Sequence, residues 1–135
     1  MKDANDEKVI AAALVAREKA YAPYSNYRVG AALLGQNDRI YTGCNIENAS
    51  FGATICAERV AAVKAVSEGE TKFLLLVVAT ASQPPAFSCG ICRQFLAEFG
   101  MDLKIILVNP LGDRVETTLA DCLPGAFGPH QLKQL

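Results

Sequence analysis

The first apolar pattern along the chain is that of a helix. In residues 7–21, EKVIAAALVAREKAY, Val9, Ala12, Ala13 and Ala16 recur at helical spacing on or near one face. The sequence APYS, which follows directly, ends this pattern. We therefore predict a helix over these residues.

The next apolar runs have the length of strands. Residues 28–35 and 39–47 are short extended runs separated by Gln-Asn-Asp, a turn-rich tripeptide, so they predict a β-hairpin. Residues 72–81 and 103–110 are continuous apolar runs, which are typical of strands buried on both faces. The chain therefore supplies a hairpin and at least two buried strands.

Helical stretches alternate with these strands. Residues 55–68 and 88–100 predict two helices, and residues 114–124 indicate a short strand followed by a helical turn. The order α-β-β-α-β-α-β-β-α contains no linker or repeat, so we expect one domain over residues 1–135. Helices that alternate with buried strands predict an α/β fold, a three-layer α/β/α sandwich around one mixed five-stranded sheet.

Composition narrows the classes of function. The formal net charge is −1 and there is no lysine or arginine cluster, which disfavours nucleic-acid binding because that binding requires phosphate neutralisation. No apolar run approaches the roughly 20 residues that span a bilayer. The N-terminal sequence also lacks the continuous apolar core of a signal peptide. We expect a cytoplasmic protein that binds neither membranes nor nucleic acid.

The five cysteines point to a site. An odd count without an export signal argues against a disulfide scaffold. Cys89 and Cys92 form a Cys-x-x-Cys pair, which alone also fits a redox dithiol or two small buried residues. Cys56 adds a third thiol at another predicted helix start, where the helix dipole stabilises a thiolate. Three such ligands fit a tetrahedral zinc ion.

The fourth zinc ligand separates a structural site from a catalytic one. His130 lies in the C-terminal tail and belongs to no ligand motif. Cys44 and Cys122 remain possible ligands, although both positions are typical of small core residues. If either closed the site, the protein would be a non-catalytic zinc protein. We expect an open position instead, where zinc lowers the pKa of a bound water to about 7.

Glu58 stands two positions after Cys56. It is well placed to accept a proton from a water bound beside that cysteine and to deliver the proton elsewhere. The alternative role is that of a helix N-terminal glutamate stabilised by the dipole. Next to a predicted zinc ligand, we favour the acid–base role.

Several longer motifs carry a family resemblance. The motifs are YAPYSNYRVGAALL, TGCNIENASFG, TICAER, SCGICRQ and LPGAFGP. Together they resemble the zinc-dependent cytidine deaminases, and specifically the small homotetrameric ones. The resemblance covers almost the whole chain. It implies hydrolytic deamination of cytidine and 2′-deoxycytidine to uridine and 2′-deoxyuridine in pyrimidine salvage, with one Zn²⁺ per subunit on Cys56, Cys89 and Cys92.

The resemblance also assigns the substrate pocket. Asn45 and Glu47 stand two apart at a strand end, so their side chains point the same way, and resembling enzymes bind the ribose 3′-hydroxyl there. Tyr27 occupies the position of an aromatic, usually Phe, that stacks on the base. Ala57 would lend backbone groups to the base.

Further pocket residues are implied to come from a neighbouring subunit of a homotetramer with shared active sites. These are Ala49, Phe51 and Phe127, although Phe127 also fits a local cap on its own core.

Two residues next to the cysteines need separate comment. Three thiolates leave Zn²⁺ with a net charge of −1, and Arg59 is expected to offset it by donating hydrogen bonds to the sulfurs, the alternative being a solvated helix residue. Ser88 departs from the family, which usually has Pro there, and we expect it to cap the following helix.

Rival substrates remain open within the same fold. The nearest alternatives are an aminopyrimidine antibiotic or a nucleotide, and a nucleic-acid editing deaminase is disfavoured by the missing basic patch.

Overall fold

The computed structural model describes residues 4–133, so the ends of the predicted domain, residues 1–3 and 134–135, lie outside the described residues. The elements, in chain order, are α1 (Ala4–Arg17), β1 (Gly30–Gly35), β2 (Ile40–Cys44), the 3-10 turn η1 (Phe51–Ala53), α2 (Ala57–Ser67), β3 (Phe73–Ala79), α3 (Gly90–Ala97), β4 (Lys104–Val108), β5 (Arg114–Thr118), α4 (Leu119–Cys122) and α5 (Pro129–Leu132).

The five strands form one mixed sheet in the order β2-β1-β3-β4-β5. Strands β3 and β4 are parallel, with Val77 opposite Ile106, and they are joined by α3. All other neighbours are antiparallel, beginning with the predicted β1–β2 hairpin. The predicted mixed five-stranded sheet is confirmed.

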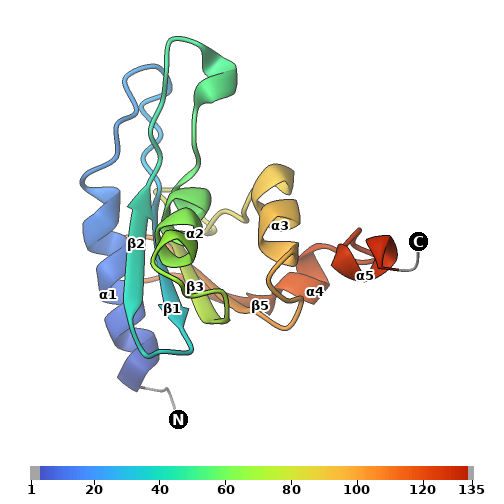
Figure 1. Cartoon of the computed structure of the whole chain (residues 1–135). Coiled ribbons are helices and arrows are strands. Elements are labelled where there is room, and N and C mark those ends of the chain that lie inside the picture. Colours follow the sequence, from blue (N-terminus) through green and yellow to red (C-terminus); the bar gives the residue numbers. More distant parts are fainter. Residues whose placement is uncertain (1–3, 134–135) are drawn as a thin grey trace.

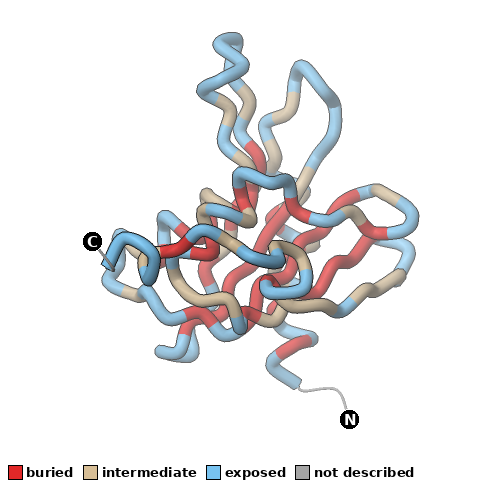
Figure 2. The backbone as a smooth tube through the Cα atoms, turned by 90° about the vertical axis from the view of Figure 1, so that its right-hand side faces the viewer, coloured by how far each residue is buried: buried red, intermediate tan, exposed pale blue. Residues whose placement is uncertain are grey.

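Helices cover both faces of this sheet (Figure 1), which confirms the predicted three-layer sandwich. Helix α1 covers one face, and α2 and α3 cover the other. Figure 2 shows that buried residues are concentrated in the strands, whereas the loops that project at one end are largely exposed. The fully buried residues of the α1 face are Val9, Ala13, Ala32, Val77, Ala79 and Ile106. Those of the α2 and α3 face are Ala31, Leu33, Ala57, Ala61, Ala62, Ala65, Leu76, Leu96, Leu107 and Leu119.

Element bounds differ slightly from the predictions. The first helix ends at Arg17, and residues 18–20 continue as turns that bond to carbonyls three residues back. Helix α2 begins at Ala57 because Cys56 is its extended N-cap residue. The short helix α5 and η1 were not predicted, since segments of three or four residues carry no periodicity.

Gly43 allows the first turn of α2 to lie directly on the sheet. A Cβ at Gly43 would be 2.5 Å from the Ala57 carbonyl oxygen and 2.6 Å from the Ala61 nitrogen. Both atoms belong to the backbone, so the helix itself would have to move. The position of the Cys56–Glu58 segment therefore depends on the absence of a side chain in β2.

We expect Gly43→Ala to lower the free energy of unfolding by about 1–3 kcal/mol, because forcing atoms into a packed region shifts the backbone. The measurement is the midpoint temperature of thermal unfolding. Gly52→Ala is the matched control, since a Cβ there meets nothing within 4 Å. Equal midpoints for the two variants would contradict this account of the α2 contact.

Both edges of the sheet carry charged side chains. At the β2 edge, the Lys64 Nζ donates to the Thr42 carbonyl oxygen at 2.5 Å. At the β5 edge, the Arg114 guanidinium pairs with Glu116 at 2.8 Å and with Glu7 of α1 at 2.9 Å. Charged side chains therefore lie beside both outer strands, β2 and β5.

Among residues 4–133, no helix combines the length and the apolar composition needed to cross a membrane.

Candidate active site

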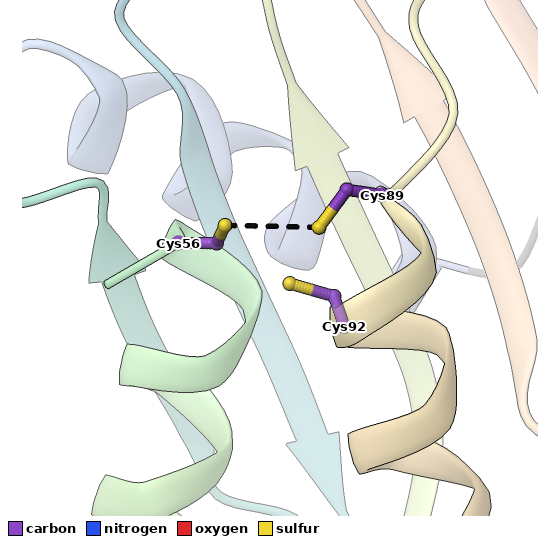
Figure 3. Close-up of side chains that lie close together, drawn as sticks. All are labelled: Cys56, Cys89 and Cys92. Atoms are coloured by element: carbon purple, nitrogen blue, oxygen red, sulfur yellow. Dashed lines mark hydrogen bonds between the residues drawn. The ribbon is translucent and has the colours of Figure 1, made fainter. Parts of the chain in front are cut away.

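Two helix N-termini bring the three predicted zinc ligands together. Cys56 is the N-cap residue of α2 and Cys89 is the N-cap residue of α3. Cys92 lies one turn further along α3 and is fully buried. Figure 3 shows the three sulfurs converging between the helices, and all three lie within 4.8 Å of one another.

The cysteine geometry fits a tetrahedral zinc ion. Tetrahedral zinc with Zn–S bonds of about 2.3 Å holds two sulfurs about 3.8 Å apart. The Cys56 and Cys89 sulfurs are 3.8 Å apart, without any disulfide between them. Thiolates are also among the ligands that zinc prefers. The three side chains are therefore arranged as a metal site.

The other cysteines do not join this cluster. Cys44 lies at the end of β2 and Cys122 at the end of α4, and both are half-buried. Within residues 4–133, the group of possible metal ligands contains only Cys56, Cys89 and Cys92. The alternative of a site closed by Cys44 or Cys122 is therefore unsupported by the geometry.

Arg59 donates a hydrogen bond to this cluster, as the sequence suggested. Its Nη2 lies 3.5 Å from the Cys56 sulfur, which raises the pKa of the guanidinium. The pKa of Cys56 is lowered, first by a hydrogen bond from the Cys92 thiol and also by Arg59. The same sharing of a proton raises the pKa of Cys92. Cys56 is thus predisposed to be a thiolate.

Glu58 is buried in the first turn of α2 and is only 4% exposed. Burial raises the pKa of its carboxyl group above the usual value, and the nearby Ser88 hydroxyl opposes that shift. A carboxyl group with a raised pKa accepts and returns protons more readily near neutral pH. The environment therefore suits the acid–base role predicted for Glu58.

The prediction that Ser88 caps α3 is wrong. The N-cap residue is Cys89, which makes no side-chain capping bond, and Ser88 lies one position before it. Ser88 is instead fixed through its carbonyl oxygen, which accepts from the Arg93 Nε at 2.8 Å. Arg93 also donates to the Cys122 carbonyl oxygen at 3.0 Å, so it ties the start of α3 to α4.

A cavity of about 210 Å³ opens beside the cysteines. It brings together six of the predicted site residues: Tyr27, Asn45, Cys56, Ala57, Glu58 and Cys89. The other residues of the lining were not predicted from the sequence: Val29, Thr54, Val78, Thr80, Ala86 and Phe87. Two of these residues could have been expected from their positions in the sequence. Thr80 directly follows a buried strand, and Phe87 lies two residues before Cys89.

Asn45 and Glu47 both face the segment 21–29. The Asn45 amide donates to the Tyr27 carbonyl oxygen at 2.8 Å and accepts from the Val29 nitrogen at 2.9 Å. The Glu47 carboxylate accepts from the Tyr24 nitrogen at 2.9 Å and from the Ser25 hydroxyl. These hydrogen bonds lower the pKa of Glu47, with the Ser25 side chain as the main cause.

Asn45 and Glu47 line different hollows. Asn45 lines the main cavity, whereas Glu47 lines an adjoining hollow with Tyr24, Ser25, Phe51 and Thr54. Thr54 borders both, so the two hollows are neighbours.

The three residues assigned to a neighbouring subunit lie outside the main cavity. Ala49 is exposed, Phe51 is 73% exposed and Phe127 is 54% exposed. Phe51 stacks edge-on against Tyr24, with ring centroids 5.6 Å apart. The Phe127 carbonyl oxygen accepts from the Gln94 amide at 2.9 Å, so this contact holds the backbone of Phe127 and not its ring.

Comparison with known proteins places this site in a family. The model of the cytidine and deoxycytidylate deaminase zinc-binding region matches residues 3–108, which include all three cysteines and Glu58. The chain belongs to the cytidine and deoxycytidylate deaminase family. As a member of this family it is a zinc-dependent deaminase, and zinc is its cofactor.

Several members of the family are similar over nearly their whole length. A protein named cytidine deaminase from Sporosarcina psychrophila is 50% identical over 127 residues, covering 93% of this chain and 93% of that protein. Another of that name, from Halalkalibacterium halodurans, is 47% identical over 122 residues, covering 90% and 92%. The crystal structure of cytidine deaminase from Burkholderia pseudomallei has a TM-score of 0.87 at 44% identity, covering 90% of this chain and 98% of that one.

Proposed function

We propose that this protein deaminates cytidine and 2′-deoxycytidine to uridine and 2′-deoxyuridine, releasing ammonia. One observation carries the proposal: the buried carboxyl group of Glu58 shares a cavity with the thiols of Cys56 and Cys89. Relatives named cytidine deaminase that match most of the chain favour a cytosine nucleoside as the substrate. We also propose that residues 1–135 act as one domain. The reaction takes place in the cytoplasm and serves pyrimidine salvage in this proposal.

The proposed chemistry has two parts, activation of water by bound zinc and proton transfer by the carboxyl group of Glu58. Cys56, Cys89 and Cys92 would hold the ion, and zinc bound there would act as a Lewis acid that lowers the pKa of a water to about 7. Glu58 accepts the first proton of the attacking water and delivers it to N3 of the cytosine ring. It then takes the remaining proton of the new hydroxyl group at C4 and gives it to the amino group. Ammonia leaves and the carbonyl of uridine forms, so atoms and protons balance.

The cavity walls supply recognition in this proposal. The ring of Tyr27 packs against the pyrimidine, and the backbone of Ala57 contacts the base. Asn45 keeps a second amide hydrogen beyond the one donated to the Tyr27 carbonyl oxygen, and Glu47 keeps acceptor capacity for a ribose 3′-hydroxyl. A 3′-hydroxyl contact accommodates both ribose and deoxyribose.

The assembly is proposed to be a homotetramer with shared active sites. Phe51 and Phe127 are large apolar side chains left mostly exposed, and Ala49 lies on the same exposed segment as Phe51. We propose that these three residues complete the pocket of a neighbouring subunit. An isolated subunit is then expected to be inactive.

The test is the ultraviolet absorbance change of cytidine mixed with zinc-loaded protein, with a zinc-stripped sample as control. Cytosine, a cytosine nucleotide and an aminopyrimidine antibiotic complete the panel. We expect zinc-dependent conversion of cytidine and deoxycytidine and slow conversion of free cytosine. Faster conversion of the nucleotide or antibiotic would reassign the substrate, and no conversion of any of them would overturn the proposal.

Arg59→Ala is expected to weaken zinc retention about 10- to 100-fold, as loss of a hydrogen bond to a metal ligand generally does. The reason is the hydrogen bond from Arg59 to the Cys56 sulfur at 3.5 Å. The measurement is the rate of zinc transfer to a coloured chelator. Arg39→Ala is the control, because that arginine pairs on the surface with Glu68. Equal transfer rates for both variants would remove Arg59 from the metal site.

A further inference from the structure

A hydrogen bond between side chains joins two segments that are far apart in the sequence. The Tyr27 hydroxyl lies 2.5 Å from the Ser82 Oγ, across 55 positions of the chain. Tyr27 precedes β1, and Ser82 lies in the segment 80–88 between β3 and the first residue of the Cys89–Cys92 pair. Tyr27 lines one wall of the cavity, and Thr80, Ala86 and Phe87 of the second segment line another. The bond therefore connects two walls of the site.

Ser82 is held in place by its backbone. Its nitrogen donates to the Thr80 Oγ1 at 3.2 Å, and its carbonyl oxygen accepts from the Asn109 Nδ2 at 3.0 Å. Asn109 follows β4, is 2% exposed and also donates to Asp113 at 2.8 Å. The Ser82 hydroxyl thus projects from a frame that is fixed to the end of the sheet.

Tyr27 is also held by its backbone, but its ring is not held by burial. Its nitrogen donates to the Ser25 Oγ at 3.0 Å and its carbonyl oxygen accepts from Asn45 at 2.8 Å. The residue is 40% exposed. An exposed aromatic side chain without a polar anchor exchanges between rotamers, and fixing it costs entropy. The hydroxyl group is the part of Tyr27 that can be anchored, and Ser82 is its partner.

We propose that the Tyr27–Ser82 hydrogen bond is a latch that holds the Tyr27 ring against the substrate base and fixes the segment 80–88. In this assignment Ser82 is a positioning residue that acts through Tyr27 and touches no substrate. The proposal rests on the proposed deamination of a cytosine nucleoside. It adds a residue outside the cavity lining to those that set substrate affinity.

A double-mutant cycle tests the latch. Tyr27→Phe and Ser82→Ala each remove one hydroxyl group and leave the backbone hydrogen bonds described above intact. Each is expected to lower kcat/KM for cytidine about fivefold, in line with loss of one hydrogen bond, mainly through KM. Because each variant already breaks the same bond, the double variant is expected to lose no more than either single one.

Two further variants separate positioning from general stability. Ser82→Thr keeps the hydroxyl group, so its KM is expected to equal that of the wild type. Ser67→Ala, which removes a hydroxyl group bonded to the Lys64 carbonyl oxygen at the end of α2, is expected to leave KM unchanged. Additive losses in the cycle, or no rescue by threonine, would overturn the latch.

Hydrogen–deuterium exchange gives a readout that does not depend on turnover. The amides of residues 81–83 and 86–88 are expected to exchange faster in Tyr27→Phe and in Ser82→Ala. In the double variant they are expected to exchange at the same rate as in either single variant. Unchanged exchange would overturn the latch. If wild-type protein failed to deaminate cytidine while the variants showed faster exchange, the assigned substrate would fall and the contact between the two walls would stand.

Discussion

Replacing Glu58 by glutamine is expected to leave zinc bound and to lower kcat about 10²- to 10⁴-fold, the range that acid–base catalysis contributes. Glutamine has nearly the same shape as glutamate, so the buried first turn of α2 is retained. The amide cannot accept the proton of the attacking water or return one to the amino group. The loss is large because one carboxyl group is assigned both proton transfers.

The measurements are kcat for cytidine and zinc content per chain in the same preparation. Glu68→Gln is the matched control, since Glu68 is an exposed residue just after α2 that pairs with Arg39. Full zinc with near-zero kcat supports the role of Glu58. Retention of more than about a tenth of the wild-type kcat would contradict it, because a loss of less than about tenfold is smaller than the contribution of acid–base catalysis.

Removing zinc is the second change with a large expected effect. Stripping the protein with a chelator is expected to abolish turnover, and adding one equivalent of Zn²⁺ is expected to restore it. Three sulfurs within 4.8 Å of one another, on two helix N-termini, provide the ligands. Stability should also fall on stripping, because binding to the folded state alone adds to the free energy of unfolding.

X-ray absorption spectroscopy of the zinc-loaded protein distinguishes the two kinds of site. We expect three sulfurs and one oxygen around zinc, as in a catalytic centre with an open position. Cys44→Ser and Cys122→Ser are the matched variants and are expected to leave that spectrum unchanged. Four sulfurs in the wild type, with loss of one in either variant, would show a closed structural site and contradict the proposed catalysis.

Much of the fold and the metal site follows from local patterns in the sequence. The apolar runs at 72–81 and 103–110 contain β3 and β4, because a strand buried on both faces leaves few polar positions. The cysteines were assigned to helix starts from sequence position, and Cys56 and Cys89 are indeed the N-cap residues. Helix starts on the same face of one sheet then bring the sulfurs together.

The features that sequence reasoning missed depend on contacts between distant segments. The Tyr27–Ser82 bond spans 55 positions, and no periodic pattern encodes such a pairing. Ser88 was assigned to a cap from its residue type, but the extended backbone of Cys89 begins the helix one residue later. Phe87 lines the cavity together with Thr80 and Ala86 of the same segment, and local propensity does not report where such a segment lies in the fold.

The charged edges of the sheet bear on how copies of this chain can meet. An edge strand with free backbone groups is a template for strand addition and aggregation, and charged side chains on the edge oppose it. Lys64 of α2 donates a hydrogen bond to the backbone carbonyl of Thr42 in β2. Arg114 and Glu116 form an ion pair on β5. We therefore expect the sheet to end at β2 and β5 in any assembly, so that subunits associate through helices and projecting loops, and partly folded chains resist joining edge to edge.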